Sequence, residues 1–480
     1  MAAVLIAAAA LAFAIWGNKE AGRRAQEASS GLNSYDYELT FLPEESALDV
    51  TMTLLCANRT GSSLDDLLLR TWAGAYQLEA TSPAASEELY AACYPGGFSP
   101  GGIAIQDVTW NGQPVDYAYD DAACTALRIS IPVLPVEGSG TLTLRARLLL
   151  PECAHRFGHA SGVWQFGNVL PILSVYQDGA WRTDEYCAVG DPFISECANY
   201  SVTLQTPSGY LCACGGACQM EKSAEGLTYR ITLPASRDFA FALSRDWQSA
   251  TAHVNGIAVT AYGPTRKGVD RAVKFAAKAL KAYANHYGDY AYSSYTLCAV
   301  DFPFGGMEYP GLTLLGLPYF ADDWADSLEL LIAHETAHQW FYALVGSDQY
   351  NDPWQDEALC EYAVLRYVRD VYGQSAYENL RLTRVEAPMR ERITKRVTPG
   401  SPISHFDSLV PYTSVVYGRG AAFLLGVEKL TGRLDAFLRT YCDRFAFALA
   451  ARADFLALLN DFTGEDLAPL MTDYLDTLMQ

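Results

Sequence analysis

The pattern of hydrophobic and polar residues changes near the middle of this 480-residue chain. Between residues 34 and 249, short alternating or β-branched runs recur, each bounded by Gly, Pro, Asn or Asp. Such runs predict strands, and their recurrence without long helical stretches predicts an antiparallel, β-sandwich-like or barrel-like domain. The clearest predicted strands are residues 35–41, 48–55, 141–149, 200–204 and 227–233.

Residues 250–480 follow a mixed pattern. Residues 267–286 repeat apolar side chains at helical spacing, and strand-like runs follow at residues 295–300 and 312–317. From Asp323 onward the pattern is mainly helical. We therefore predict an α+β domain, with a small sheet beside a helical bundle, and a domain boundary near Ser249.

Composition narrows the possible functions. The 34 Lys and Arg residues against 55 Asp and Glu residues give a net charge of −21. A surface with this much negative charge repels phosphate backbones, and we therefore expect no nucleic-acid partner. Twelve cysteines in a chain of this length are too few for a disulfide-dense miniprotein.

Residues 1–24 are expected to form a hydrophobic signal or membrane anchor. The apolar run from Ala2 to Trp16 is shorter than the roughly 20 residues of a spanning helix, and Ala12-Phe13-Ala14 suits a signal-peptide cleavage site. Basic residues follow the run, at Lys19 and Arg23, instead of preceding it. We expect an extracytoplasmic protein, secreted or membrane-anchored through this segment; a buried terminal helix is the alternative.

The strongest chemical motif is an H-E-x-x-H sequence at residues 334–338. It lies in a helical pattern expected to begin at Asp322 or Asp323 and to end at Gly346. Residues at i and i+4 share one helix face, so His334 and His338 can bind one cation. Two imidazole nitrogens suit zinc.

A third ligand is expected from the next helix. Asp352 as N-cap and Pro353 at the first helical position predict a helix start, and Glu357 falls in its opening turns. Two histidines and one carboxylate leave the fourth position of a tetrahedral zinc ion open for water. Glu335 is then placed to act as the general base.

Two further clusters are expected to be structural. His155 and His159 also have i, i+4 spacing, but Pro151 and Gly158 favour a loop over a metal site. Cys212, Cys214 and Cys218 surround a Gly-Gly pair, for which we expect a Gly-rich hairpin, with one disulfide as an open alternative. Asp356 and Glu361, beside Glu357, are expected either to be solvated or to bond a histidine.

These residues resemble the aminopeptidase N-like zinc metallopeptidases, the gluzincins with an HExxH-x18-E motif. Residues 304–310 resemble the family's G-[AG]-M-E-N exopeptidase motif, and residues 416–421 resemble its tyrosine motif. The order and spacing of the three motifs agree with the family. The resemblance implies an antiparallel β-sandwich-like saddle domain followed by an α+β thermolysin-like catalytic domain, with one Zn²⁺ per chain.

The resemblance also implies substrate-binding roles. Glu308 would bind the free α-amino group of a peptide, and Gly305, Gly306 and Met307 would line the substrate strand. Tyr417 would stabilise the oxyanion, with Tyr412 as the competing choice. Tyr309 replaces the motif's Asn, which affects substrate alignment but leaves Glu308 in place.

The sequence therefore predicts a zinc aminopeptidase that acts on peptides with a free N-terminus. Two alternatives remain at this point: a zinc endopeptidase or other zinc hydrolase on the same scaffold, and a catalytically silent binding protein. Side-chain specificity and the oligomeric state are not defined by the sequence.

Overall fold

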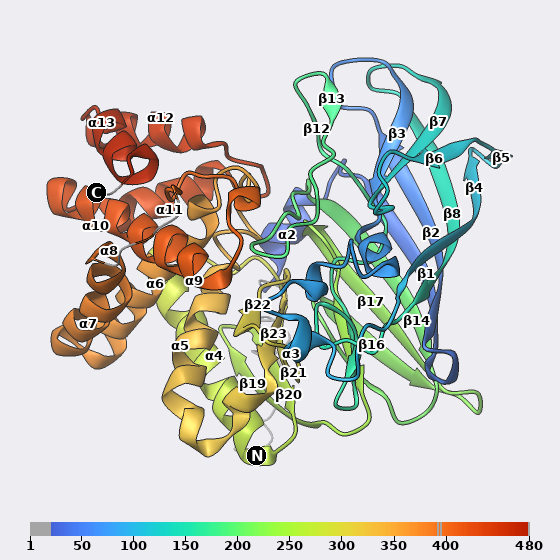
Figure 1. Ribbon diagram of the computed structural model, residues 1–480, viewed down its shortest axis with the longest axis horizontal. Coiled ribbons are helices and arrows are strands. Elements are labelled where there is room, and N and C mark those ends of the chain that lie inside the picture. Colours follow the sequence, from blue (N-terminus) through green and yellow to red (C-terminus); the bar gives the residue numbers. More distant parts are fainter. Residues whose placement is uncertain (1–20, 391–392, 394–395, 479–480) are drawn as a thin grey trace, which may run out of the picture.

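The computed structural model describes residues 21–390, 393 and 396–478, and its two halves differ in secondary structure (Figure 1). Strands fill the N-terminal half and helices dominate the C-terminal half, as the change in sequence pattern predicts. Most of the predicted signal or anchor, residues 1–20, lies outside the described residues. Within the described part of the chain, no helix is long and apolar enough to cross a membrane.

An eight-stranded sheet forms the frame of the N-terminal half. Its strands form because apolar side chains alternate: in β1 the side chains of Tyr35, Tyr37, Leu39 and Phe41 are buried. Neighbouring strands are antiparallel except for β1 and β14, which are parallel. In sheet order the strands are β16 (Ala217–Lys222), β17 (Leu227–Ser236), β14 (Ala198–Thr206), β1 (Ser34–Leu42), β2 (Ala47–Ala57), β8 (Ser139–Leu149), β4 (Gly102–Trp110) and β5 (Gln113–Pro114).

Smaller sheets complete this half of the molecule. Two of these sheets have four strands and one has two strands. They contain β15 (Leu211–Cys214), β18 (Phe241–Ser244), β10 (Val163–Phe166) and β9 (Phe157–Ala160); β11 (Ile172–Leu173), β3 (Leu64–Arg70), β7 (Ala126–Leu134) and β6 (Tyr117–Tyr119); and β12 (Tyr176–Gln177) with β13 (Ala180–Trp181).

The cysteine-rich turn differs from the expected hairpin. β15 pairs with β18 and β16 pairs with β17, so the Gly215-Gly216 turn carries the chain from one sheet to another. The hairpin prediction was wrong because β15 and β16 each pair with a different strand, β18 and β17, and not with each other. All twelve cysteines are free thiols, including the three of this turn.

The C-terminal half begins with a five-stranded mixed sheet. Its order is β19 (Gln248–Val254), β20 (Ile257–Gly263), β21 (Ser294–Val300), β23 (Leu312–Gly316) and β22 (Gly306–Met307). The short strand β22 is the edge strand and pairs antiparallel with β23. β19 spans the predicted domain boundary near Ser249.

Helices form the rest of the C-terminal half and lie at the left of Figure 1. The helices α4, α5 and α6 pack on one another, and the later helices surround them. In chain order they are α4 (Arg266–Tyr287), α5 (Ala325–Ala337), α6 (Trp354–Tyr372), α7 (Gln374–Arg381), α8 (Ala387–Arg390), α9 (Leu409–Tyr412), α10 (Gly420–Thr431), α11 (Leu434–Arg444), α12 (Arg452–Thr463) and α13 (Ala468–Met471).

The motif helix α5 is shorter than predicted at both ends. A 3-10 turn, Asp322–Trp324, precedes it, and the Asp322 carboxylate accepts from Lys267 and Arg271 instead of capping the helix. The helix ends at Ala337, nine residues before Gly346. The predicted end was wrong because the backbone beyond Ala337 bonds differently: Ala343 N–H donates to His338, five residues earlier, and Gly346 N–H donates to Ala448. Arg237 binds the carbonyls of Tyr342 and Leu344 in this segment.

The helix that carries Glu357 starts close to the predicted position. α6 begins at Trp354, with Pro353 rather than Asp352 as its N-cap. The Asp352 carboxylate accepts instead from the Trp354 indole at 3.1 Å and from Arg452 at 3.4 Å.

Arg237 joins the two halves at a buried point. It lies between β17 and β18 and is only 1% exposed. Besides Tyr342 and Leu344, its guanidinium donates to the carbonyls of Ser195 at 3.0 Å and Ala448 at 2.6 Å. A buried cation is stabilised only when its donors are satisfied, and here four carbonyls from three backbone segments supply acceptors.

Candidate metal centre

Three ligand atoms meet between α5 and α6. The Nε2 atoms of His334 and His338 lie 3.1 Å apart, and Glu357 Oε2 lies 3.2 Å from the first and 3.5 Å from the second. Tetrahedral zinc with bonds of about 2.0–2.1 Å places its ligand atoms about 3.3 Å from one another. The three atoms therefore fit one zinc ion, and the structure brings together the three residues that the sequence proposed as ligands.

The outer nitrogens of the histidines face carboxylates. Asp356 Oδ1 lies 2.6 Å from His338 Nδ1, and Glu361 Oε1 lies 3.2 Å from His334 Nδ1, at ion-pair distance but outside hydrogen-bond geometry. A carboxylate at Nδ1 favours a proton there, which leaves the Nε2 lone pair free for a metal. Of the two alternatives for Asp356 and Glu361, contact with a histidine is the one observed.

The charges of the cluster favour a cation at its centre. Burial alone would raise the pKa of Glu357, but its contacts with His334 and His338 outweigh burial and lower that pKa well below its usual value. Burial alone would lower the pKa of His334, but Glu357 and Glu361 raise it to about 9. A proton or a metal ion at the centre satisfies this balance, and the paired Nε2 atoms favour a metal.

Glu335 lies beside the triad without being part of it. Its side chain is buried, and Oε2 has no hydrogen-bond partner among the described residues. Burial raises the pKa of Glu335 to about 7, although His334 and His338 oppose the shift. A side chain on Gly306 would place its Cβ 2.3 Å from Glu335 Oε1, so Gly306 gives the carboxylate its space. A carboxylate with this pKa is suited to accept and return a proton near neutral pH.

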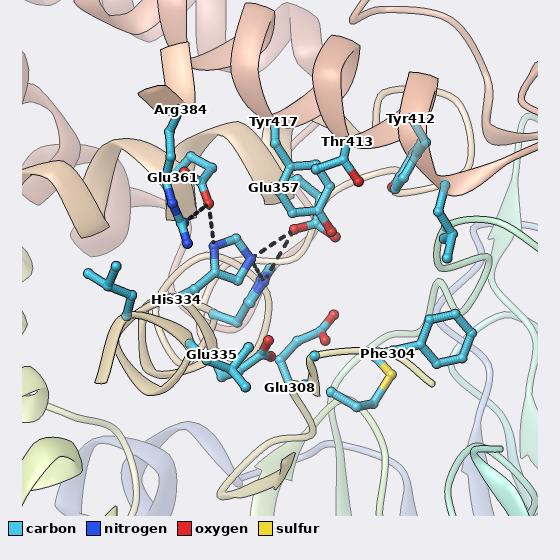
Figure 2. Close-up of a pocket in the computed structure, with 18 of the residues that line it drawn as sticks. Phe304, Glu308, His334, Glu335, Glu357, Glu361, Arg384, Tyr412, Thr413 and Tyr417 are labelled. Atoms are coloured by element: carbon cyan, nitrogen blue, oxygen red, sulfur yellow. Dashed lines mark hydrogen bonds and ion pairs between the residues drawn. The ribbon is translucent and has the colours of Figure 1, made fainter. Parts of the chain in front are cut away.

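The triad opens into a cleft of about 620 Å³ between the two halves of the molecule (Figure 2). The edge strand β22 and the residues on either side of it form one wall, and they present Gly305, Gly306, Met307 and Glu308 to the cleft. Glu308 is 4% exposed, and its oxygen lies within 4.8 Å of ligand atoms of both Glu335 and His338. Burial raises the Glu308 pKa well above its usual value, and the carboxylates of Asp191 and Asp356 add to the shift.

Tyr417 and Tyr412 both line the cleft, but they face different parts of it. The Tyr417 ring stacks on His334 at 5.5 Å, and the Tyr412 ring meets Tyr417 edge to face at 5.7 Å (Figure 2). Tyr417 belongs to a π-helical segment, Thr413–Arg419, and such segments are frequent at functional sites. Burial raises the Tyr417 pKa well above its usual value, and the nearby charge of Glu357 adds to it, so its hydroxyl is a donor at neutral pH.

Sequence reasoning missed three charged residues of the cleft. Asp191 and Arg156 come from the N-terminal half, where Arg156 Nη2 donates to Asp191 at 2.5 Å. Arg384 comes from a second π-helical segment, Leu382–Glu386, and its Nη1 donates to Glu361 at 2.7 Å. No sequence motif marks these residues, because each reaches the site from a segment distant in the chain.

The second histidine pair takes no part in the ligand triad or in any other group of possible metal ligands among the described residues. His155 is buried with Nδ1 2.5 Å from the Tyr76 hydroxyl, and His159 lies in β9 with its ring packed on Trp164. Neither lies in a helix, as predicted. Cys360 and Cys298 are both buried.

Comparisons with known proteins agree with this geometry. Residues 271–474 match the model of the peptidase family M1 domain. Over 196 residues the chain is 29% identical to aminopeptidase B of Rattus norvegicus, covering 37% of this chain and 29% of that protein. It is 30% identical over 185 residues to leukotriene A-4 hydrolase of Xenopus laevis, covering 35% and 29%. The matches thus span less than a third of the length of these curated relatives.

Solved structures extend the likeness to the fold of both halves. An M1 zinc metallopeptidase mutant from Deinococcus radiodurans superposes with a TM-score of 0.68 at 16% identity, over 94% of this chain and 96% of that one. The same mutant bound to a Tyr-Ser-Ala substrate gives a TM-score of 0.66 at 16% identity, over 94% and 96%. These findings confirm the predicted family resemblance and the predicted two-part fold. Residues 271–474 therefore match the peptidase family M1 domain, and the chain as a whole shares the two-domain fold of the solved M1 zinc metallopeptidase structures.

Proposed function

We propose that this chain is a zinc-dependent aminopeptidase that removes N-terminal residues from peptides, with one Zn²⁺ bound by His334, His338 and Glu357. The observation that carries the proposal is the buried Glu308 carboxylate, within 4.8 Å of ligand atoms of His338 and Glu335. A carboxylate so close to the reaction centre limits how far a substrate extends beyond the bond to be cleaved. It suits a substrate whose chain begins there with a cation.

Glu308 and Asp191 together supply negative charge for an α-ammonium group. Burial raises the pKa of Asp191 to about 6, and Arg156 opposes that shift. A substrate ammonium would stabilise both carboxylates in their charged form. Arg156 anchors Asp191 at the cleft wall, so the N-terminal half takes part in substrate recognition.

The edge strand β22 offers a place for the peptide backbone. It has a neighbour, β23, on one side only, so its other side is available for an extended peptide. The backbone from Glu308 to Gly305 runs past the Glu335 carboxylate, which lies against Gly306. An N-terminal residue bound at Glu308 would therefore present its carbonyl near the histidines.

The chemistry follows from the residues around that carbonyl. Zinc, when bound, supplies Lewis-acid activation of water and of the scissile carbonyl. Glu335 accepts the proton of the attacking water and returns it to the leaving amine. Tyr417 donates its phenolic hydrogen bond to the oxygen that gains negative charge.

An extracytoplasmic location, secreted or anchored through residues 1–24, is part of the proposal.

The test compares free and N-acetylated peptides with the zinc-loaded chain and Glu308→Gln. The wild type should cleave free-amine peptides, and Glu308→Gln should lose kcat/KM by about 10²-fold on them, because a charged hydrogen-bond partner is removed. Glu329→Gln on α5 is the matched control, since Glu329 binds Lys278 and Tyr367 away from the cleft.

The other outcomes identify the alternatives. Equal cleavage of acetylated and free peptides would indicate an endopeptidase or another zinc hydrolase. Stoichiometric zinc without turnover of any peptide would indicate a silent binding protein.

A further inference from the structure

The cleft contains two arginines in different surroundings. Arg156 is 5% exposed and its guanidinium is bound to Asp191. Arg384 has a side chain that is 34% exposed and lines the cleft at a different place. In a chain with a net charge of −21, an accessible cation beside the reaction centre indicates an anionic ligand group.

Contacts fix where the Arg384 guanidinium lies. Its Nη1 donates to Glu361 Oε1 at 2.7 Å, and the same oxygen lies 3.2 Å from His334 Nδ1. The guanidinium is thus anchored on the His334 side of the metal centre. Among the described residues, Glu361 is the one ion-pair partner recorded for Arg384, and a guanidinium has five N–H donors. Donors therefore remain for a second acceptor.

Glu308 lies on the other side of the centre. Its oxygen clusters with Glu335 and His338, whereas Arg384 reaches the centre through Glu361 and His334. Figure 2 shows Arg384 with Glu361 on one side of His334 and Glu308 on the other. The cleft therefore carries the Glu308 carboxylate on one side of the centre and the accessible guanidinium of Arg384 on the other.

We propose that Arg384 binds the C-terminal carboxylate of a dipeptide or tripeptide substrate, an inference that rests on the proposed aminopeptidase function. A peptide bound with its α-ammonium at Glu308 runs past the histidines towards Arg384. Two or three extended residues span about 7 to 11 Å, so the far end of a short zwitterion lies near the guanidinium. Arginine binds carboxylates in a two-pronged geometry that an amide cannot reproduce.

The first test compares matched pairs of peptides, Ala-Phe with Ala-Phe-amide and Ala-Phe-Ala with its amide. The zinc-loaded wild type should prefer the free acid in at least one pair by about 10- to 100-fold in kcat/KM. In Arg384→Gln this ratio should fall close to one, and in Arg384→Lys it should be intermediate. Zinc content is measured in each variant.

A purely structural role for Arg384 gives a different result. If Arg384 only supports Glu361 and His334, Arg384→Gln will lower zinc content or activity on acid and amide equally and leave their ratio unchanged. Asp356→Asn is the matched control, because it should weaken zinc binding through His338 without touching the contact between Arg384 and Glu361, so the acid-to-amide ratio should persist. An unchanged ratio in Arg384→Gln, or no preference in the wild type, overturns the proposal.

A binding measurement separates this inference from the proposed function. Calorimetric titration of zinc-loaded Glu335→Gln with Ala-Phe and Ala-Phe-amide requires no turnover. A tighter Kd for the acid that is lost on adding Arg384→Gln supports carboxylate binding even if no peptide is hydrolysed. Equal Kd values for acid and amide overturn it even if the chain is an active aminopeptidase.

Discussion

The Tyr309 hydroxyl donates a 2.9 Å hydrogen bond to Asn168 Oδ1, and this bond ties the loop after Glu308 to the N-terminal half. Asn168 in turn donates to Asp238 Oδ2 at 3.0 Å. Tyr309 replaces the Asn of the exopeptidase motif, and its contacts show what the replacement does. It connects the segment after β22 to the β-rich half of the molecule.

Tyr309→Phe should therefore loosen Glu308 without unfolding the protein. We expect a loss of about 1 kcal/mol in the free energy of unfolding, because one buried hydrogen bond is removed, and a several-fold rise in KM for free-amine peptides. Gly167→Ala should be more damaging, because its Cβ would lie 1.9 Å from the Tyr309 hydroxyl. Thermal unfolding and steady-state kinetics measure both effects; unchanged KM in both variants would contradict this role.

Glu335→Gln should retain zinc and lose turnover. The carboxamide keeps the shape of the side chain but cannot accept the proton, so kcat should fall by about 10²–10⁴-fold. Metal analysis and single-turnover kinetics check the two halves of the prediction. Activity within a few-fold of the wild type would rule out Glu335 as the general base.

Tyr417→Phe should reduce kcat, and Tyr412→Phe should not. Loss of an oxyanion donor costs about 10²–10³-fold in rate, and Tyr417 is the tyrosine that stacks on His334. Steady-state kinetics of the two single variants on one peptide compare them directly. A larger kcat defect in Tyr412→Phe would reverse the assignment.

Asp356→Asn and Glu361→Gln should weaken zinc binding by about 10- to 100-fold, because each carboxylate supports the outer nitrogen of one histidine. Competition with a metal chelator gives the affinities. Because Asp356 also accepts from Gln349, its replacement should shift the unfolding temperature as well. Unaltered affinity in both variants would show that the triad is held without these contacts.

Asp238 should make the stability of the protein fall as the pH rises. Burial raises the pKa of Asp238 to about 7, although the Tyr342 hydroxyl and Arg237 oppose it. The folded chain therefore holds this proton up to about pH 7, whereas the unfolded chain releases it near pH 4. Its stabilising effect is fully present below about pH 4 and is lost as the pH rises through 7, by up to about 4 kcal/mol.

Asp238→Asn removes this titration and keeps an oxygen acceptor for Asn168 and Tyr342. The variant should gain stability relative to the wild type at both pH values, and the gain should be clearly larger at pH 8 than at pH 5. Denaturant unfolding at the two pH values measures the difference. Asp36→Asn, on the exposed face of β1, is the control. Parallel pH profiles for Asp238→Asn and the wild type would contradict the shift.

Local pattern predicted the parts of the fold that local forces determine. Alternation placed β1 and β2, and helical spacing placed α4, because each element buries one face of its own sequence. The H-E-x-x-H spacing brought His334 and His338 together for the same reason. Glu357 followed from a helix start that the sequence marks with Pro353.

What the sequence did not predict depends on distant partners. Beyond α5 the chain bonds to distant segments instead of continuing as a helix, since Gly346 N–H donates to Ala448 and Arg237 binds the carbonyls of Tyr342 and Leu344. The two strands on either side of Gly215-Gly216 do not pair with each other: β15 pairs with β18, and β16 pairs with β17. Asp191 and Arg384 enter the cleft from other segments, and no local pattern marks such residues.

The position of Arg237 also bears on how this protein can be divided. Its guanidinium sits in the N-terminal half, and three of its four backbone acceptors belong to the C-terminal half. Cutting the chain between the two halves would leave the Arg237 guanidinium without most of its acceptors on one fragment. The other fragment would contain three carbonyls that have lost their donor. We expect that neither fragment is soluble alone, and that the intact molecule melts in a single transition.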